Sequence, residues 1–229
     1  EKVKKLMKPN LANIFEMRSK TLHNQCKMQN THCENCASKA VNRLKMAEDL
    51  IFCMIPKVGT TTILNHLYYQ HGMLKNNKVN KGAHHVGAAT KSHVMPRSHF
   101  TQEKLMEVMT SEVNSVTPLR ILVVRPPLER LHSAYKDKFG GGLPVKYGKL
   151  KKWVKTSKGL GPKRQGKYSV SMTQFLTRIT KYDNVHWTPY WNQCSPCQVK
   201  YDFILHLSEI DDELDYIYDV ANIKDHLST

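Results

Sequence analysis

A lysine, a glycine and three threonines follow directly after an apolar run in the first third of the chain. The run Leu50–Ile55 leads into Pro-Lys-Val-Gly-Thr-Thr-Thr. Where a buried strand turns into a helix, successive backbone N–H groups point at one spot, and the helix dipole favours an anion there. A lysine adds positive charge, and threonine hydroxyls add hydrogen-bond donors. This pattern predicts a phosphate or sulfate site, although an ordinary helix cap is the alternative. The predicted loop consists of Pro56, Lys57, Val58, Gly59, Thr60, Thr61 and Thr62.

A second anion site is predicted at Arg125 and Ser133. Arg125 ends the apolar run Arg120–Arg125, and ligands of open α/β sheets bind at the carboxyl ends of strands. Ser133 lies two turns into the helix expected next. Two such sites suit a nucleotide with phosphates at both its 5′ and 3′ positions. The alternatives are a salt bridge for Arg125 and a surface position for Ser133.

The elements that would position these residues alternate between strands and helices. Leu50–Ile55 and Arg120–Arg125 are typical of buried strands, and each precedes a segment with helical spacing of apolar residues. This order predicts an α/β fold with three layers, a parallel sheet and a P-loop-like anion-binding loop. Helices are predicted over Thr60–Tyr69, Thr101–Met109, Pro126–Gly140, Ser171–Ile179 (opened by a capping box) and Ser208–Val220, and a strand over Tyr201–His206.

The length of 229 residues predicts one domain, residues 1–229. Within it we expect a helical, cysteine-containing extension over residues 1–48 and a basic loop over residues 146–167. No stretch has the roughly 18 consecutive apolar residues of a membrane span, and the first residues lack the apolar core of a signal peptide. Since the chain begins with Glu1, we expect a fragment whose targeting segment was removed.

Positive charge dominates the composition. Lys and Arg number 35 against 19 Asp and Glu, which gives a formal net charge of +16 at pH 7. Such a field attracts polyanions of any chemistry, so nucleic acid, an acidic membrane and an acidic glycan all fit. Residues 146–167 hold many Lys and Arg and no acid, which indicates either the lining of a polyanion site or a solvated loop.

The chain has 6 cysteines. Two CxxC pairs could indicate zinc, but they lie far apart and lack the usual finger spacing. An even count is typical of an oxidising compartment, where the cysteines other than Cys53 could supply two disulfides of undetermined connectivity. Cys53 lies inside an apolar run and is predicted to be a buried free thiol. The other cysteines are Cys26, Cys33, Cys36, Cys194 and Cys197.

Three segments, in order, resemble the Golgi carbohydrate sulfotransferases. Ile55-Pro-Lys-Val-Gly-Thr-Thr61 is similar to their 5′-phosphosulfate-binding loop, and Val124-Arg-Pro-Pro-Leu-Glu-Arg-Leu-His-Ser-Ala-Tyr-Lys-Asp-Lys-Phe139 to their 3′-phosphate-binding segment. His186-Trp-Thr-Pro and Cys194-Ser-Pro-Cys197 resemble the branch with the chondroitin and dermatan 4-O-, N-acetylgalactosamine 4-O- and HNK-1 sulfotransferases. Pro126 and Gly59-Thr60 depart from the usual pattern of this branch.

The resemblance implies a donor and roles for the site residues. The donor is 3′-phosphoadenosine 5′-phosphosulfate (PAPS), the product is adenosine 3′,5′-bisphosphate (PAP), and no metal is needed. Lys57 is expected to stabilise the charge on the leaving oxygen, and Arg125 and Ser133 to bind the 3′-phosphate. Arg130 and Lys138 are expected to be structural or solvent-facing.

A histidine is expected to act as the base that removes the proton of the acceptor hydroxyl. The segment His84–His93 resembles the stretch that presents this histidine in the family, and His85 aligns best. His84, His93 and His186 are the alternatives. Trp187 and Tyr190 could form a wall of the sugar or adenine site, or belong to the core.

The resemblance also implies a partner and a location. The expected acceptor is an anionic glycan of the chondroitin or dermatan type, or one ending in N-acetylgalactosamine, and no nucleic acid is expected. The expected location is the Golgi lumen, for a type II membrane protein whose anchor is absent from this chain, and Cys194-Ser-Pro-Cys197 would belong to a secretory disulfide framework. Two alternatives stay open: a nucleotide-dependent phosphoryl transferase, which should carry a Walker lysine, and a non-catalytic heparin- or nucleic-acid-binding module.

Overall fold

The computed structural model describes residues 2–29, 44–47, 50–70, 107, 118–140, 143–144, 167–168 and 170–221. The chain divides into two compact units. The first consists of residues Glu1–Arg125 and Pro189–Thr229, and the second of Pro126–Thr188. Apart from Glu107, the helix predicted over 101–109 lies outside the described residues, as does the basic loop apart from Lys167.

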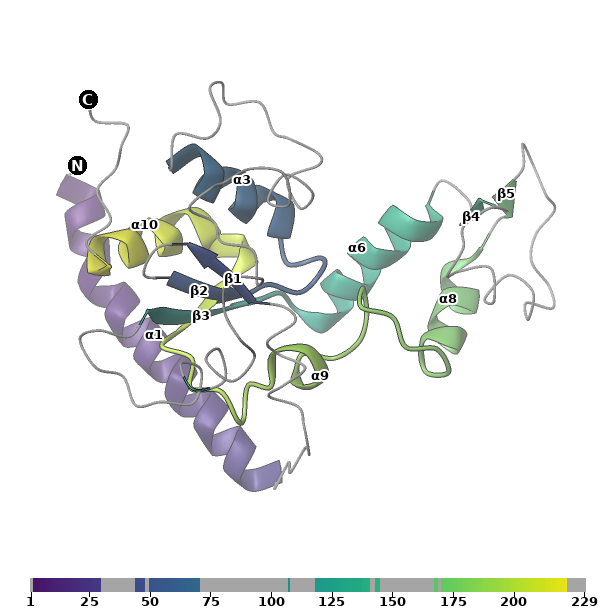
Figure 1. Cartoon of the computed structure of the whole chain (residues 1–229), viewed down its shortest axis with the longest axis horizontal. Coiled ribbons are helices and arrows are strands. Elements are labelled where there is room, and N and C mark those ends of the chain that lie inside the picture. The colour runs from purple at the N-terminus through teal and green to yellow at the C-terminus, as the bar shows by residue number, and fades with distance from the viewer. Residues whose placement is uncertain are drawn as a thin grey trace. The chain divides into compact units, whose positions relative to one another are not determined.

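A four-stranded sheet forms the centre of the first unit (Figure 1). Its strands are β1 (Leu44–Ala47), β2 (Leu50–Cys53), β3 (Leu119–Val124) and β6 (Phe203–His206), and they lie in the order β1-β2-β3-β6. β2 pairs with β3 and β3 with β6 in parallel. The carboxyl ends of these three strands therefore share one edge of the sheet, as the α/β prediction requires.

The prediction of a wholly parallel sheet was wrong at β1. This strand pairs with β2 in antiparallel fashion, with Ala47 opposite Leu50. Only two residues separate the strands, and a connection this short permits a hairpin but no crossover. β1 lies within residues 1–48, where a helical extension was expected.

The described residues of the first unit form five helical elements. They are α1 (Lys2–Gln29), α3 (Thr60–Gln70), α9 (Trp191–Cys194), the 3₁₀ helix η2 (Leu207–Glu209) and α10 (Ile210–Val220). The helices predicted after β2 and near the C-terminus are confirmed as α3 and α10. α1 and α10 contact each other and β6, and the Phe15 ring packs 5.1 Å from Phe203 and 5.5 Å from Tyr216. In the described part of the chain, no helix is long and apolar enough to cross a membrane.

A buried ion pair fixes the register of β3 and β6 at their amino ends. The Arg120 side chain is fully buried, and its Nε and Nη2 each donate to an Asp202 carboxylate oxygen at 3.1 Å. The Arg120 backbone N–H also donates to this carboxylate, and the Asp202 N–H returns a bond to the Arg120 carbonyl. A bidentate pair with its lone pairs satisfied is the form of ion pair that tolerates burial.

Among the described residues of the first unit, two disulfides close long loops. Cys53, at the end of β2, is bonded to Cys194 in α9, and Cys26 in α1 is bonded to Cys197. The prediction of a free thiol at Cys53 was therefore wrong: the apolar run buries the sulfur, but the fold also brings Cys194 to a Cα–Cα distance of 5.9 Å. Cys194 and Cys197 are half-cystines, so they do not serve as thiolate ligands for zinc. Cys33 and Cys36 lie outside the described residues.

The second unit has its own small core. It contains α6 (Pro127–Phe139), the short strand pair β4 (Leu143–Pro144) and β5 (Lys167–Tyr168), and α8 (Met172–Ile179). Both predicted helices are confirmed, and Ser171 and Gln174 form the reciprocal hydrogen bonds of the predicted capping box. Trp187 packs edge-on against Phe175 at 5.4 Å and donates its indole N–H to the Tyr182 carbonyl, so it is a core residue.

Candidate functional site

The loop after β2 adopts a conformation that few side-chain-bearing residues accept. Lys57 and Gly59 both have positive φ angles, 77° and 79°. Val58, between them, is fully buried and anchors the loop in the core. A non-glycine residue held in this region costs about 1–3 kcal/mol, and such strain concentrates at functional sites. The backbone around Lys57 is thus held in place by the packing of Val58.

The loop leads directly into α3. The first hydrogen bond of that helix runs from the Ile63 N–H to the Gly59 carbonyl at 3.0 Å, so the amides of Thr60, Thr61 and Thr62 precede the helical pattern. The Thr60 hydroxyl donates to the Ile55 carbonyl at 2.8 Å and closes the turn. Thr60 therefore shapes the loop with its side chain, whereas Thr61 is half-buried and Thr62 exposed.

Arg125 lies beside this loop. It follows the last residue of β3, the parallel neighbour of β2, and its Nη1 atom lies 3.4 Å from the Lys57 carbonyl oxygen. The structure thus brings together two of the predicted cationic residues at the carboxyl edge of the sheet. Two cations on adjacent strand ends form a field that suits an anion with more than one charge.

Tyr190 holds the backbone of Arg125. Its hydroxyl accepts the Arg125 N–H at 2.9 Å and lies 3.3 Å from the Arg125 carbonyl oxygen, to which it donates. Sequence reasoning considered Tyr190 as a pocket wall and missed this contact. An aromatic residue separated from Arg125 by 65 positions carries no local signal of such a bond.

The remaining predicted residues are not brought into this arrangement by the described contacts. Ser133 belongs to the second unit, where it lies partly buried on α6, and its role at a 3′-phosphate stays a prediction. Arg130 is buried in the same unit and donates to the carbonyls of Thr188 and Val185, which confirms a structural role.

Of the four candidate bases, the structure describes His186. His84, His85 and His93 lie outside the described residues, so the choice among them stays a prediction. His186 is half-buried in the second unit, and its backbone N–H donates to the Asn184 side chain at 3.0 Å.

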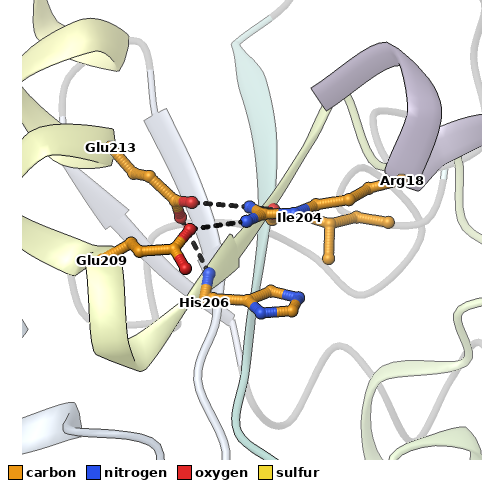
Figure 2. A network of polar contacts seen from close by, with 5 residues as sticks. All are labelled: Arg18, Ile204, His206, Glu209 and Glu213. Atoms are coloured by element: carbon orange, nitrogen blue, oxygen red, sulfur yellow. Dashed lines mark hydrogen bonds and ion pairs between the residues drawn. The ribbon is translucent and has the colours of Figure 1, made fainter. Parts of the chain in front are cut away.

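A charged network lies where β6 ends, on the same edge of the sheet as Lys57 and Arg125 (Figure 2). Arg18 of α1 donates to Glu213 at 2.6 Å, to Glu209 at 2.9 Å and to the Ile204 carbonyl at 2.8 Å. The other Glu213 oxygen accepts the His206 backbone N–H at 2.8 Å. Burial raises the pKa of Glu213 to about 7 against the opposing effect of Arg18, and burial also lowers the pKa of His206.

The family profile and the relatives that match this chain are those of sulfotransferases. The sequence profile described as "Sulfotransferase family" matches residues 42–229. Carbohydrate sulfotransferase 14 of Danio rerio is 23% identical over 233 residues, which cover 93% of this chain and 59% of that protein. Human carbohydrate sulfotransferase 10 is 26% identical over 200 residues, which cover 78% of this chain and 51% of that protein. Human carbohydrate sulfotransferase 14 is 31% identical over 113 residues, covering 47% of this chain and 30% of that protein.

These matches confirm the resemblance that the three sequence segments predicted. The chain spans little more than half the length of the zebrafish protein and of human carbohydrate sulfotransferase 10. No solved structure matches this chain.

Proposed function

The chain belongs to the sulfotransferase family, and on that premise we propose that it transfers a sulfuryl group from PAPS to a sugar hydroxyl. The observation that carries the proposal is a contact across two parallel strand ends, in which Nη1 of the Arg125 guanidinium donates to the Lys57 backbone carbonyl at 3.4 Å. It supports a site for a doubly phosphorylated nucleotide because each strand end contributes one cation to the same edge.

The loop fits the donor's phosphosulfate in three respects. Lys57 and Gly59 hold positive φ angles, so their peptide groups turn in directions that a helix or strand does not allow. The amides of the first turn of α3 face the same end of the helix, where its dipole favours negative charge. Lys57 supplies a full positive charge, which stabilises the oxygen that leaves sulfur.

The proposed reaction balances with one base and no redox step. The acceptor hydroxyl oxygen forms a bond to sulfur while the bond from sulfur to the 5′-phosphate oxygen breaks, and PAP leaves. The acceptor proton passes to a histidine, for which we propose His85. Lys57 stabilises the negative charge that accumulates on the departing oxygen. Arg125 binds the 3′-phosphate and so orients the donor.

We propose an acidic galactosaminoglycan as the acceptor class. The formal net charge of +16 supports this choice because a polyanionic chain is drawn to such a field from a distance. The two described disulfides support a location in an oxidising compartment, where such bonds persist. We propose the Golgi lumen, because it is such a compartment and suits an enzyme that modifies glycans.

Two measurements test the proposal. In a thermal-shift assay, PAP should raise the melting temperature strongly, and neither MgATP nor heparin should be the only compound that does so. In a transfer assay with labelled PAPS, desulfated chondroitin or dermatan should be turned over faster than free N-acetylgalactosamine. Stabilisation only by MgATP would indicate phosphoryl transfer, and a response only to heparin would indicate a polyanion-binding module. Equal turnover of neutral and acidic acceptors would overturn the proposed acceptor class alone.

A further inference from the structure

The backbone of Arg125 lies just beyond the last pair of β3 with β6. The pairing of β3 with β6 ends at Val124 opposite His206, so the N–H of Arg125 falls one residue beyond the last paired position. A partly buried amide that lacks a partner costs free energy, and fixing such an amide also fixes the direction in which the residue's side chain leaves the backbone.

The Tyr190 hydroxyl satisfies this amide and its carbonyl together. It accepts from the Arg125 N–H at 2.9 Å and donates to the Arg125 carbonyl at 3.3 Å. One rigid phenol thus holds both polar groups of a single residue. Because Arg has a long flexible side chain, its guanidinium can be placed reproducibly only if its Cα is held in this way.

Tyr190 is itself fastened to the sheet. The Cys194 N–H donates to the Tyr190 carbonyl at 2.7 Å, and Cys194 is bonded to Cys53 at the end of β2. The Tyr201 hydroxyl donates to the Cys194 carbonyl at 2.6 Å from a buried position. The hydroxyl that holds Arg125 on β3 therefore stands on a short segment that is covalently tied to β2, the neighbouring strand.

We propose that Tyr190 is a positioning residue for the 3′-phosphate of the donor, acting through Arg125. This assignment rests on the proposed function. It makes the Tyr190 hydroxyl matter for nucleotides that carry a 3′-phosphate and not for those that lack one.

The test is Tyr190→Phe in the full chain, which removes one oxygen and keeps the ring. Affinity is measured by titration calorimetry for PAP and for adenosine 5′-monophosphate, which differ only in the 3′-phosphate. We expect PAP to bind about 3- to 10-fold more weakly, as the loss of one net hydrogen bond implies, and adenosine 5′-monophosphate to bind as to the wild type. In an Arg125→Ala background the same substitution should have no further effect on PAP binding.

A matched control separates positioning from stability. Tyr135→Phe also removes one phenolic hydroxyl, but that hydroxyl donates to the Val170 carbonyl at 2.8 Å within the second unit and takes no part in anchoring Tyr190 in the described contacts. It should lower the melting temperature while leaving the ratio of the two nucleotide affinities unchanged. Equal weakening of both nucleotides by Tyr190→Phe, or wild-type PAP affinity in that variant, would overturn the assignment. If the wild-type chain does not bind PAP, this result overturns the proposed function itself, and with it the role of Tyr190.

Discussion

Gly59 packs so closely against Leu207 that a Cβ atom on residue 59 would overlap the Cδ1 atom of Leu207. The loop after β2 and the turn after β6 therefore share one contact at the carboxyl edge of the sheet. Gly59 also has a φ of 79°, a conformation that disfavours any side chain. Two independent constraints thus require glycine at this position.

Gly59→Ala should disturb the loop through both constraints. We expect a loss of about 1–3 kcal/mol in the free energy of unfolding, measured with urea, and at least about 10-fold weaker binding of PAP. In the Leu207→Ala background the overlap with the new Cβ atom disappears, but the φ penalty remains. Gly59→Ala should therefore lower the free energy of unfolding by less in that background than in the wild type. Wild-type PAP affinity in folded Gly59→Ala would contradict a role for this loop in donor binding.

Lys57 combines a functional charge with an unfavourable backbone angle, so two substitutions can separate these properties. Lys57→Ala and Lys57→Gly both remove the ammonium group and should both lower turnover about 10²- to 10³-fold. Glycine accepts a φ of 77° without a Cβ penalty, so the Gly variant should be about 0.5–1 kcal/mol more stable than the Ala variant.

Activity assays and urea unfolding of these two variants provide the comparison. Lys20→Ala is the control, because Lys20 is exposed on α1 and pairs only with the neighbouring Glu16 in the described contacts. It should leave turnover unchanged. Wild-type rates in either folded Lys57 variant would remove Lys57 from the reaction.

The two disulfides should differ in their effect on nucleotide binding. Each closes a loop of more than 100 residues, so replacing either pair with alanine should cost about 2–5 kcal/mol in stability. Cys53–Cys194 anchors the Tyr190–Cys194 segment directly, because the Cys194 N–H donates to the Tyr190 carbonyl, whereas Cys26–Cys197 ties down the chain beyond Cys194. We therefore expect the Cys53→Ala/Cys194→Ala variant to bind PAP more weakly and the Cys26→Ala/Cys197→Ala variant to bind it normally, measured at a temperature where both are folded. Equal affinities in the two variants would argue against this coupling.

Local patterns in the sequence predicted much of this architecture. The capping box at Ser171 and Gln174 set the start of α8 because both partners lie within one turn. The proximity of Arg125 to Lys57 followed from two strand-to-helix turns, since parallel neighbours must end at the same edge. The free thiol predicted at Cys53 was wrong, and the contact of Tyr190 with Arg125 was missed, because the partners lie 141 and 65 positions away and spacing does not encode which distant residues the fold brings together.

Glu213 should make stability depend on pH in an unusual direction. Burial raises its pKa to about 7 from an ordinary 4.5, so the folded state holds this proton more tightly than the unfolded chain does. The stabilisation is complete below about pH 4.5 and is lost as the pH rises to about 7. The free energy of unfolding of the wild type, minus that of Glu213→Gln, should fall by on the order of 2 kcal/mol across this window.

Other groups facing Glu213 must be separated from this effect. Arg18 from α1 donates to both Glu213 and Glu209, and the pKa of Glu209 is lowered by its hydrogen bond to Glu213. Burial lowers the pKa of His206, so its contribution is lost as the pH falls below about 6.5, the opposite slope. Subtracting the free energy of unfolding of Glu213→Gln from that of the wild type at each pH removes the contributions of the groups that both proteins contain. A difference that stays flat from pH 4.5 to 7 would show that Glu213 is ionised throughout this range.

The pH dependence of kcat can identify which histidine acts as the base in the proposed reaction. If His85 removes the acceptor proton, kcat of the wild type should fall at low pH as the imidazole becomes protonated, and His85→Ala should lose both about 10²- to 10⁴-fold in rate and this acidic limb. His84→Ala is the matched control, a neighbouring histidine removed in the same way, and it should keep the limb. Both variants should bind PAP with wild-type affinity, because the base acts on the acceptor. If the limb disappears in His84→Ala and persists in His85→Ala, the two assignments must be exchanged.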